Sequence, residues 1–175
     1  SSFVLILIFS ISTTCSFALT GEEIYEQNRR GVCTIITTFV YDIPNSLGIM
    51  FGKEEHTQNI HGTGSFIDTE GDILTAAHCV VFENASGKNI LKKTKFLITV
   101  VKSDGSRRIY EGKLIGVNKS VDSAIIRAMN IKESEYTVIA IGNSDTLKAG
   151  QLVCAIASPL DPNLYGSFWT TSIGF

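Results

Sequence analysis

Two side chains of this protein have the chemical types that acid–base catalysis requires, the imidazole of His78 and the carboxylate of Asp122. His78 stands in the run LTAAHCV at 74–80, where a histidine is more often a packed core residue than a catalyst. Asp122 precedes the apolar run SAII, where an aspartate ordinarily opens a strand. An imidazole that accepts a proton needs a carboxylate to fix its tautomer and stabilise its charged form. The two residues therefore predict a catalytic site only if the fold brings them together.

The rest of the chain has the pattern of a β protein. Its 175 residues are 44% hydrophobic and 18% charged and include 15 glycines, which is typical of one or two folded domains with many turns. No internal repeat is present. Apolar and β-branched runs between turn residues predict strands at 31–42, 63–68, 72–75, 95–101, 107–118, 122–129, 150–158 and 166–175. Short strands at this spacing favour an all-β barrel or sandwich.

Two segments are predicted to be neither strand nor simple turn. Residues 20–30 indicate a short helix, because Thr20 followed by Glu23 forms a capping-box pattern. Residues 130–145 are the most linker-like interior segment and mark a candidate domain boundary. These features divide the chain into a helix, a long block of strands and a shorter second block.

The polar segment 43–62 is predicted to be a loop, since it contains a proline, several glycines and several charges. His56 and His61 lie in this segment, and solvation at the surface is the expected role of both. Of the three histidines, His78 is therefore the one that remains a candidate for catalysis.

Longer stretches around the candidate residues are much more specific. The segment GTGSFIDTEGDILTAAHCV at 62–80 resembles the histidine segment of trypsin-like (chymotrypsin-fold) serine peptidases. The segment VDSAIIRA at 121–128 resembles the aspartate segment of the same family. Residues 141–175 are similar to the start of the second barrel in its HtrA/Deg branch. The resemblance covers about residues 31 to 175.

This resemblance implies an all-β fold, the trypsin-like double Greek-key β-barrel. After a short N-terminal helix at 19–30, the first barrel is expected to be complete within 31–130 and to carry both His78 and Asp122. Residues 131–175 are expected to hold the linker and the start of a second, truncated barrel. The chain is interpreted as the N-terminal fragment of a longer protein.

The resemblance also implies the roles of the site residues: His78 is the general base and Asp122 orients it. The family's nucleophile is a serine in a Gly-Asp/Asn-Ser-Gly-Gly segment that also forms the oxyanion hole, and the chain contains no such segment. The stretch GNSD at 142–145 begins correctly but lacks the two glycines, so Ser144 is interpreted as a linker residue. The nucleophile is expected beyond Phe175, and the fragment alone is expected to be inactive.

The cysteines leave their pairing open. If Cys15 leaves with a signal peptide, the three that remain are Cys33, Cys79 and Cys154, an odd number. No two of them lie at zinc-ligand spacing, so neither a metal nor another cofactor is expected. In digestive-type members of the family the cysteine after the histidine pairs with a cysteine where this chain has Gly62. Cys33 is an alternative partner that the sequence leaves undecided.

The first 18 residues predict export. An apolar run from Phe3 to Ile11 is followed by Ser16-Phe17-Ala18, which favours a signal peptide over 1–18, incomplete at its start. The run is too short for a stable membrane anchor. The net charge of −2, with no basic stripe, gives no indication of nucleic-acid binding. If the source is a eukaryote, Asn84 and Asn118 begin glycosylation sequons.

The sequence therefore predicts a secreted or extracytoplasmic serine endopeptidase that acts on protein or peptide substrates. Two alternatives remain. One is a catalytically dead homologue that serves as a binding or regulatory module, and the other is a relative with a cysteine nucleophile. The predicted export argues against the second alternative, because an exposed thiolate oxidises outside the cell. Cleavage specificity and oligomeric state are not predicted.

Overall fold

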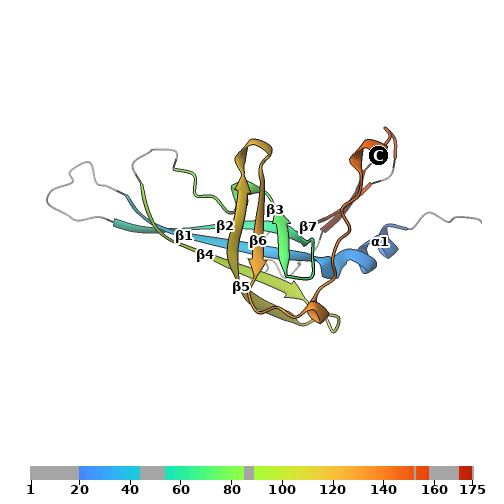
Figure 1. The fold of residues 1–175 in the computed structure, drawn as a ribbon, viewed down its shortest axis with the longest axis horizontal. Coiled ribbons are helices and arrows are strands. Elements are labelled where there is room, and N and C mark those ends of the chain that lie inside the picture. The colour runs from blue at the N-terminus through green and yellow to red at the C-terminus, as the bar shows by residue number, and fades with distance from the viewer. Residues whose placement is uncertain (1–19, 44–53, 85–88, 152, 158–169, 175) are drawn as a thin grey trace, which may run out of the picture.

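The computed structural model describes residues 20–43, 54–84, 89–151, 153–157 and 170–174 (Figure 1). The signal peptide predicted at 1–18 lies outside the described residues. The helical elements are α1 (Gly21–Asn28) and the 3₁₀ turns η1 (Arg29–Gly31), η2 (Ala77–Cys79), η3 (Lys119–Val121), η4 (Glu133–Glu135) and η5 (Ser144–Thr146). The strands are β1 (Val32–Ile43), β2 (Glu54–Phe66), β3 (Asp72–Thr75), β4 (Ile90–Val101), β5 (Arg107–Asn118), β6 (Ser123–Ala128), β7 (Val153–Ala157) and β8 (Thr170–Gly174).

Strands β1 to β6 form one closed antiparallel barrel in the order β1–β2–β3–β6–β5–β4. Two runs of three strands, β1–β2–β3 and β4–β5–β6, follow the chain order, and the pairs β3–β6 and β4–β1 join the runs. Strands β7 and β8 form a separate two-stranded sheet. The predicted all-β class and the predicted first barrel are confirmed.

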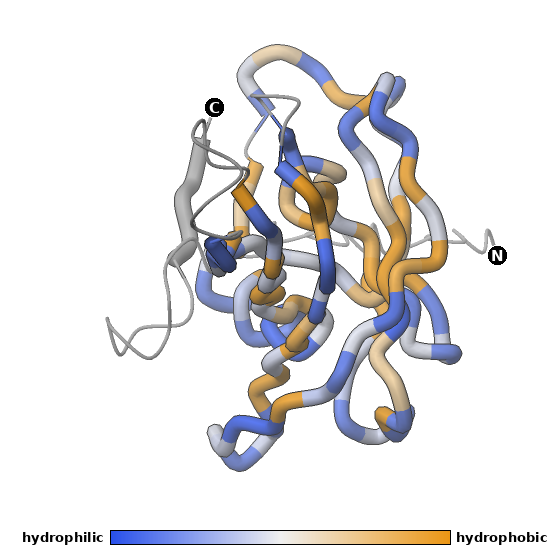
Figure 2. The backbone as a smooth tube through the Cα atoms, turned by 90° about the vertical axis from the view of Figure 1, so that its left-hand side faces the viewer, coloured by the Kyte–Doolittle hydropathy of each residue, from blue (hydrophilic) through white to orange (hydrophobic). Residues whose placement is uncertain are grey.

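The barrel interior is filled by alternate residues of its strands. On β1 the inward positions include Cys33, Ile35 and Phe39, each with at most 1% of its surface exposed. Cys33 and Ile35 belong to one core cluster with residues of the other strands, among them Phe66, Ile73, Ile98, Val100, Ala124 and Ile126. Figure 2 shows the alternation of apolar and polar residues along the strands. Burial of these side chains is what closes the barrel.

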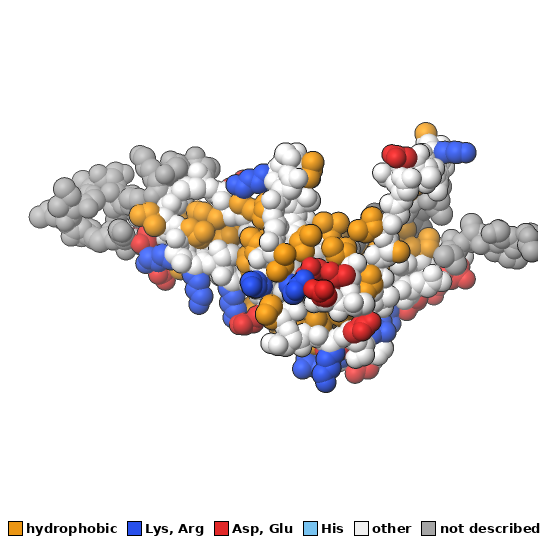
Figure 3. Space-filling view, viewed as in Figure 1, with side chains coloured by type: hydrophobic (Ala, Val, Ile, Leu, Met, Phe, Trp, Pro, Cys, Tyr) orange, Lys and Arg blue, Asp and Glu red, His pale blue; other side chains and the backbone are white. Residues whose placement is uncertain are grey.

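The outside of the barrel is not uniformly polar. In β5 only Tyr110 is buried, although the strand also contains Ile109, Leu114, Ile115 and Val117. The face drawn in Figure 3 has apolar side chains along its middle, and Lys and Arg side chains interspersed with Asp and Glu along its lower edge. The apolar content of β5 therefore predicted a strand correctly but did not indicate which of its faces is buried.

The helix α1 begins as its capping-box pattern predicts. The Thr20 hydroxyl accepts a hydrogen bond from the Glu23 backbone N–H at 3.2 Å, and the Glu23 carboxylate accepts one from the Thr20 backbone N–H at 2.7 Å. Within the described part of the chain, no helix is long and apolar enough to cross a bilayer.

The prediction of a loop over 43–62 is wrong for its second half. Residues 54–62 belong to β2, which pairs with β1 over all but its last residue, from Val32↔Ser65 to Ile43↔Glu54. Only Ser65 and Phe66 of β2 pair with β3, so most of the strand buries neither face deeply and keeps polar side chains. Backbone pairing with β1 thus forms a strand that the side-chain pattern did not reveal.

His56 and His61 accordingly lie on β2 and not on a loop, and both are half-buried. The ring of His56 stacks on Tyr41 of β1, with centroids 6.0 Å apart. Neither histidine lines the pocket that contains His78.

The start of the predicted linker is bound to the barrel. Tyr136 is 5% exposed and stacks on Phe66, with ring centroids 4.1 Å apart. The backbone N–H of Thr137 donates to the carbonyl of Arg30, and that of Ile139 donates to the carbonyl of Phe66. Residues 131–139 therefore fold with the barrel.

Gly64 of β2 allows two strands to approach closely. A Cβ at this position would overlap the Ile73 side chain and lie 2.8 Å from Cδ1 of Ile35. Because both neighbours are fully buried, neither can move aside without disturbing the core.

We expect Gly64→Ala to lower the free energy of unfolding by about 1–3 kcal/mol, since the added methyl overpacks the core. Gly116→Ala on β5 is the matched control, because a Cβ there meets nothing within 4 Å. Urea denaturation of both variants measures the difference. Equal stability of the two variants would contradict this account of the barrel.

Candidate active site

Strands β3 and β6 bring the two candidate residues together. They pair antiparallel from Asp72↔Arg127 to Thr75↔Ala124, so the end of β3 lies beside the start of β6. His78 follows β3 on the 3₁₀ turn η2, and Asp122 immediately precedes β6. Residues that are distant in the sequence thus become neighbours at one end of a strand pair.

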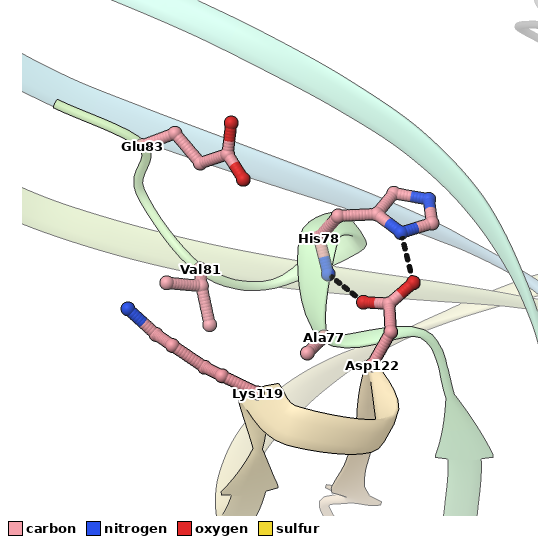
Figure 4. A pocket seen from close by; sticks show the side chains of 6 residues that line it. All are labelled: Ala77, His78, Val81, Glu83, Lys119 and Asp122. Carbon is pink, nitrogen blue, oxygen red and sulfur yellow. Dashed lines mark hydrogen bonds and ion pairs between the residues drawn. The ribbon is translucent and has the colours of Figure 1, made fainter. Parts of the chain in front are cut away.

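Asp122 holds the His78 turn through three hydrogen bonds. Its carbonyl accepts from the Ala77 backbone N–H at 3.1 Å, and its Oδ1 accepts from the His78 backbone N–H at 2.9 Å. Its Oδ2 lies 2.6 Å from Nδ1 of the His78 ring (Figure 4). An ionised carboxylate only accepts hydrogen bonds, so Nδ1 carries the proton. In the neutral imidazole the other ring nitrogen, Nε2, is then the one with a free lone pair, and it points away from Asp122 in Figure 4.

The same contacts keep Asp122 charged. Hydrogen bonds from the His78 backbone N–H and then from its side chain lower the pKa of the Asp122 carboxyl below its usual value. The His78 and Asp122 side chains are 62% and 53% exposed, so the pair is open to solvent on one side. The site therefore holds an oriented, accessible imidazole beside a stable anion.

The backbone of Asp122 is left-handed, with φ 49° and ψ 46°. This conformation costs a non-glycine residue about 1–3 kcal/mol, although aspartate adopts it more readily than most residues. The preceding turn η3 is fixed by Asn118, whose side-chain oxygen accepts from the backbone N–H of Ser120 at 3.1 Å and from its hydroxyl at 2.6 Å. Asn118 thus orders the turn that precedes Asp122, and the contacts with Ala77 and His78 hold Asp122 itself.

A pocket of about 110 Å³ adjoins the pair and is lined by Ala77, His78, Val81, Glu83, Lys119 and Asp122 (Figure 4). None of these six lining residues carries a hydroxyl or a thiol. Ser144 is not among them and lies in the turn η5. In the described residues, no three His, Cys, Asp or Glu side chains form a metal-binding group.

An ion pair fixes the far end of the β3–β6 pair. The Arg127 Nε atom lies 2.6 Å from Oδ1 of Asp72, and its Nη2 lies 2.9 Å from Oδ2, which makes the contact bidentate. Arg127 also contacts Glu70 at 2.8 Å. The hydrogen bond from Arg127 is the largest cause of a lowered pKa of the Asp72 carboxyl. A slip of one residue between these strands would separate the pair and displace Asp122 from His78.

The structure pairs none of the described cysteines. Cys33 and Cys79 are buried free thiols, and Cys154 on β7 is a half-buried one. Burial raises the pKa of Cys33 to about 12, and burial together with the Asp122 charge raises the pKa of Cys79. Neither buried thiol is therefore an activated nucleophile. A Cβ on Gly62 would lie 2.7 Å from Sγ of Cys79, so this glycine makes room for the free thiol.

Two residues that hold the site were not singled out from the sequence. Arg127 could have been found, because Asp72 and Arg127 place opposite charges in two predicted apolar strands. Thr37 on β1 could not, since its hydroxyl donates to the Cys79 carbonyl at 2.7 Å across a contact between distant segments.

Comparison with known proteins agrees with this geometry. The profile of the trypsin-like peptidase domain matches residues 62–173. Among curated proteins, the chain is 29% identical over 140 residues to "Protease Do-like 8, chloroplastic" of Arabidopsis thaliana, which covers 78% of this chain and 29% of that protein. It is 32% identical over 108 residues to "Probable periplasmic serine endoprotease DegP-like" of Pseudomonas fulva, which covers 62% of this chain and 19% of that protein.

Two solved structures share the fold. "HtrA-type protease AlgW with decapeptide" matches with a TM-score of 0.59 and 17% identity, covering 89% of this chain and 45% of that one. "Crystal structure of Deg5" matches with a TM-score of 0.57 and 22% identity, covering 86% and 59%. The chain belongs to the trypsin-like peptidase family, in its HtrA/Deg branch. The matches span about a fifth to a third of the length of these curated relatives.

We expect Asp72→Asn to lower the free energy of unfolding at pH 7 by about 1–3 kcal/mol, because it removes a charged partner of Arg127. Asp72 has a folded-state pKa below its unfolded value of about 3.9. Its contribution is therefore complete above about pH 5, one unit above the unfolded pKa, and is lost as the pH falls toward and through the folded pKa. Urea denaturation between pH 7 and pH 3 should show the deficit shrinking with acid. Asp145→Asn, at an exposed carboxylate, is the control. A deficit that is independent of pH would exclude this role of the ion pair.

Proposed function

We propose that the protein is a serine endopeptidase in which His78 is the general base and Asp122 is its orienting partner. What carries the proposal is the contact of 2.6 Å between Nδ1 of His78 and Oδ2 of Asp122, together with the backbone hydrogen bond from His78 to the same carboxylate. We propose further that the nucleophile is a serine located beyond Phe175. The pocket beside His78 supports this, because none of its lining residues offers a nucleophile.

The geometry supports the following reaction. Nε2 of His78 accepts the proton of the serine hydroxyl while its oxygen attacks the carbonyl carbon of a peptide bond. The resulting imidazolium is stabilised by Asp122, whose lowered pKa keeps it ionised throughout. His78 then donates the proton to the leaving amine, and an ester forms between the serine and the acyl part of the substrate. Water hydrolyses the ester by the same proton transfers in a second round.

The substrates that we propose are proteins or peptides. The solved HtrA-type relative named above was determined with a decapeptide, and the curated relatives are named as proteases. We also propose that residues 31–130 form the catalytic barrel and that the second barrel begins within 131–175, after the bound segment 131–139. A secreted or extracytoplasmic location is proposed from the predicted signal peptide, and one relative is named as periplasmic.

Labelling of the complete protein with a fluorophosphonate tests this function. We expect one serine to be labelled, and we expect His78→Ala to abolish labelling because no base remains to activate the hydroxyl. Asp122→Asn should reduce the labelling rate about 10⁴-fold, since an asparagine favours the wrong imidazole tautomer. Mass spectrometry of the labelled peptide identifies the serine. The control is Ser144→Ala, which should leave labelling unchanged.

The outcomes separate the candidate functions. Absence of labelling in a correctly folded complete protein would exclude a serine peptidase and favour a binding or regulatory homologue. Labelling by a thiol-directed reagent such as iodoacetamide, with loss of peptide cleavage, would favour a cysteine nucleophile. Loss of fluorophosphonate labelling in Ser144→Ala would instead identify Ser144 as the nucleophile and contradict its proposed location beyond Phe175.

A further inference from the structure

The hydroxyl of Thr37 contacts the catalytic turn at Cys79, a residue of the turn whose backbone Asp122 does not bind. Thr37 lies on β1, is fully buried, and donates a hydrogen bond of 2.7 Å to the carbonyl of Cys79. Cys79 is the residue next to His78 and the last residue of η2. A single side chain of β1 thus contacts the backbone of the turn that carries the imidazole.

The turn η2 needs such an anchor because it is short. It contains three residues, and its internal hydrogen bonds run from Cys79 N–H to the Ala76 carbonyl and from Val80 N–H to the Ala77 carbonyl. Asp122 binds its first half, through the N–H groups of Ala77 and His78. Asp122 is at the same time the partner of the imidazole. Its hydrogen bonds set the position of the ring relative to Asp122, but they do not by themselves set its position relative to the nucleophile.

In the part of the chain that the structure describes, no covalent cross-link holds the second half of the turn. Cys79 is a free thiol, and the neighbouring position, Gly62, has no side chain with which to bond it. The hydrogen bond from Thr37 and the packing of Cys79 against Gly62 take the place of such a link. A buried carbonyl that lost this donor would be left unsatisfied, which favours a shift of the turn.

We propose that Thr37 is a positioning residue for His78, acting through the Cys79 carbonyl to hold the imidazole at the distance from the nucleophile that proton transfer requires. This inference rests on the proposed function of His78 as general base. A displacement of about 1 Å in such a site can cost about 10²-fold in rate, so one buried hydrogen bond is sufficient to matter.

Thr34 supplies a matched control on the same strand. It is buried to the same extent as Thr37, but its hydroxyl has no hydrogen-bond partner among the described residues. Replacing either threonine by valine keeps the size and shape of the side chain and removes one hydroxyl. Only at position 37 does that hydroxyl bind the catalytic turn.

The test measures peptide cleavage and amide hydrogen exchange in the complete protein with Thr37→Val, Thr37→Ala, Thr37→Ser and Thr34→Val. We expect Thr37→Val and Thr37→Ala to lower kcat at least about tenfold with little change in KM, since the binding of substrate does not involve Thr37. Thr37→Ser retains the hydroxyl and should keep kcat within about twofold of the unchanged protein. Thr34→Val should have the same kcat as the unchanged protein.

Amide exchange provides a readout that needs no activity. The His78 N–H, which donates to Asp122, should exchange faster in Thr37→Val and Thr37→Ala but not in Thr37→Ser or Thr34→Val. If Thr37→Val does not fold, the comparison of Thr37→Ala with Thr37→Ser tests the proposal. Both side chains are smaller than threonine, and they differ only in the hydroxyl. Equal kcat and equal His78 exchange in the Ala and Ser variants would overturn the proposal. If the unchanged protein lacks peptidase activity, the proposed function fails, and the exchange result still decides whether Thr37 holds the turn.

Discussion

The register between β3 and β6 is the constraint on which the site depends. Four residue pairs, from Asp72↔Arg127 to Thr75↔Ala124, set this register. They determine which residue after β3 lies next to which residue before β6. The apolar side chains of Ile73 and Ile126 bury the inner face of this pair, and the ion pair between Asp72 and Arg127 fixes its end. Side chains with no role in chemistry thus decide where the imidazole and the carboxylate meet.

The barrel contributes only part of the hydrolytic centre that we propose. It supplies an imidazole whose tautomer is fixed and a carboxylate that stays ionised, both at the end of rigid strands. The pair remains largely open to solvent, and the adjoining pocket is lined by small, apolar and charged side chains. In the proposed reaction, the nucleophile would therefore approach His78 from outside this barrel.

The local signals in the sequence predicted the strands that bury one face, and the motif around His78 predicted the barrel. These signals failed where the side-chain pattern does not indicate how the backbone is paired. Residues 54–62 are polar because β2 extends beyond β3 there, so hydrogen bonds to β1 alone make them a strand. The sequence also left open which cysteines pair, since distances between distant segments decide it. The contact of Thr37 with the Cys79 carbonyl is invisible for the same reason.

The presence of Gly62 beside Cys79 affects how the turn with His78 responds to reducing conditions. Among the described residues, the turn with His78 is held by hydrogen bonds and packing, and no disulfide joins it to another segment. Hydrogen bonds and packing do not respond to glutathione or to the redox poise of a compartment, whereas a disulfide does. The geometry around the imidazole therefore does not depend on a disulfide between described cysteines, and a reducing agent would not break the contacts that hold it.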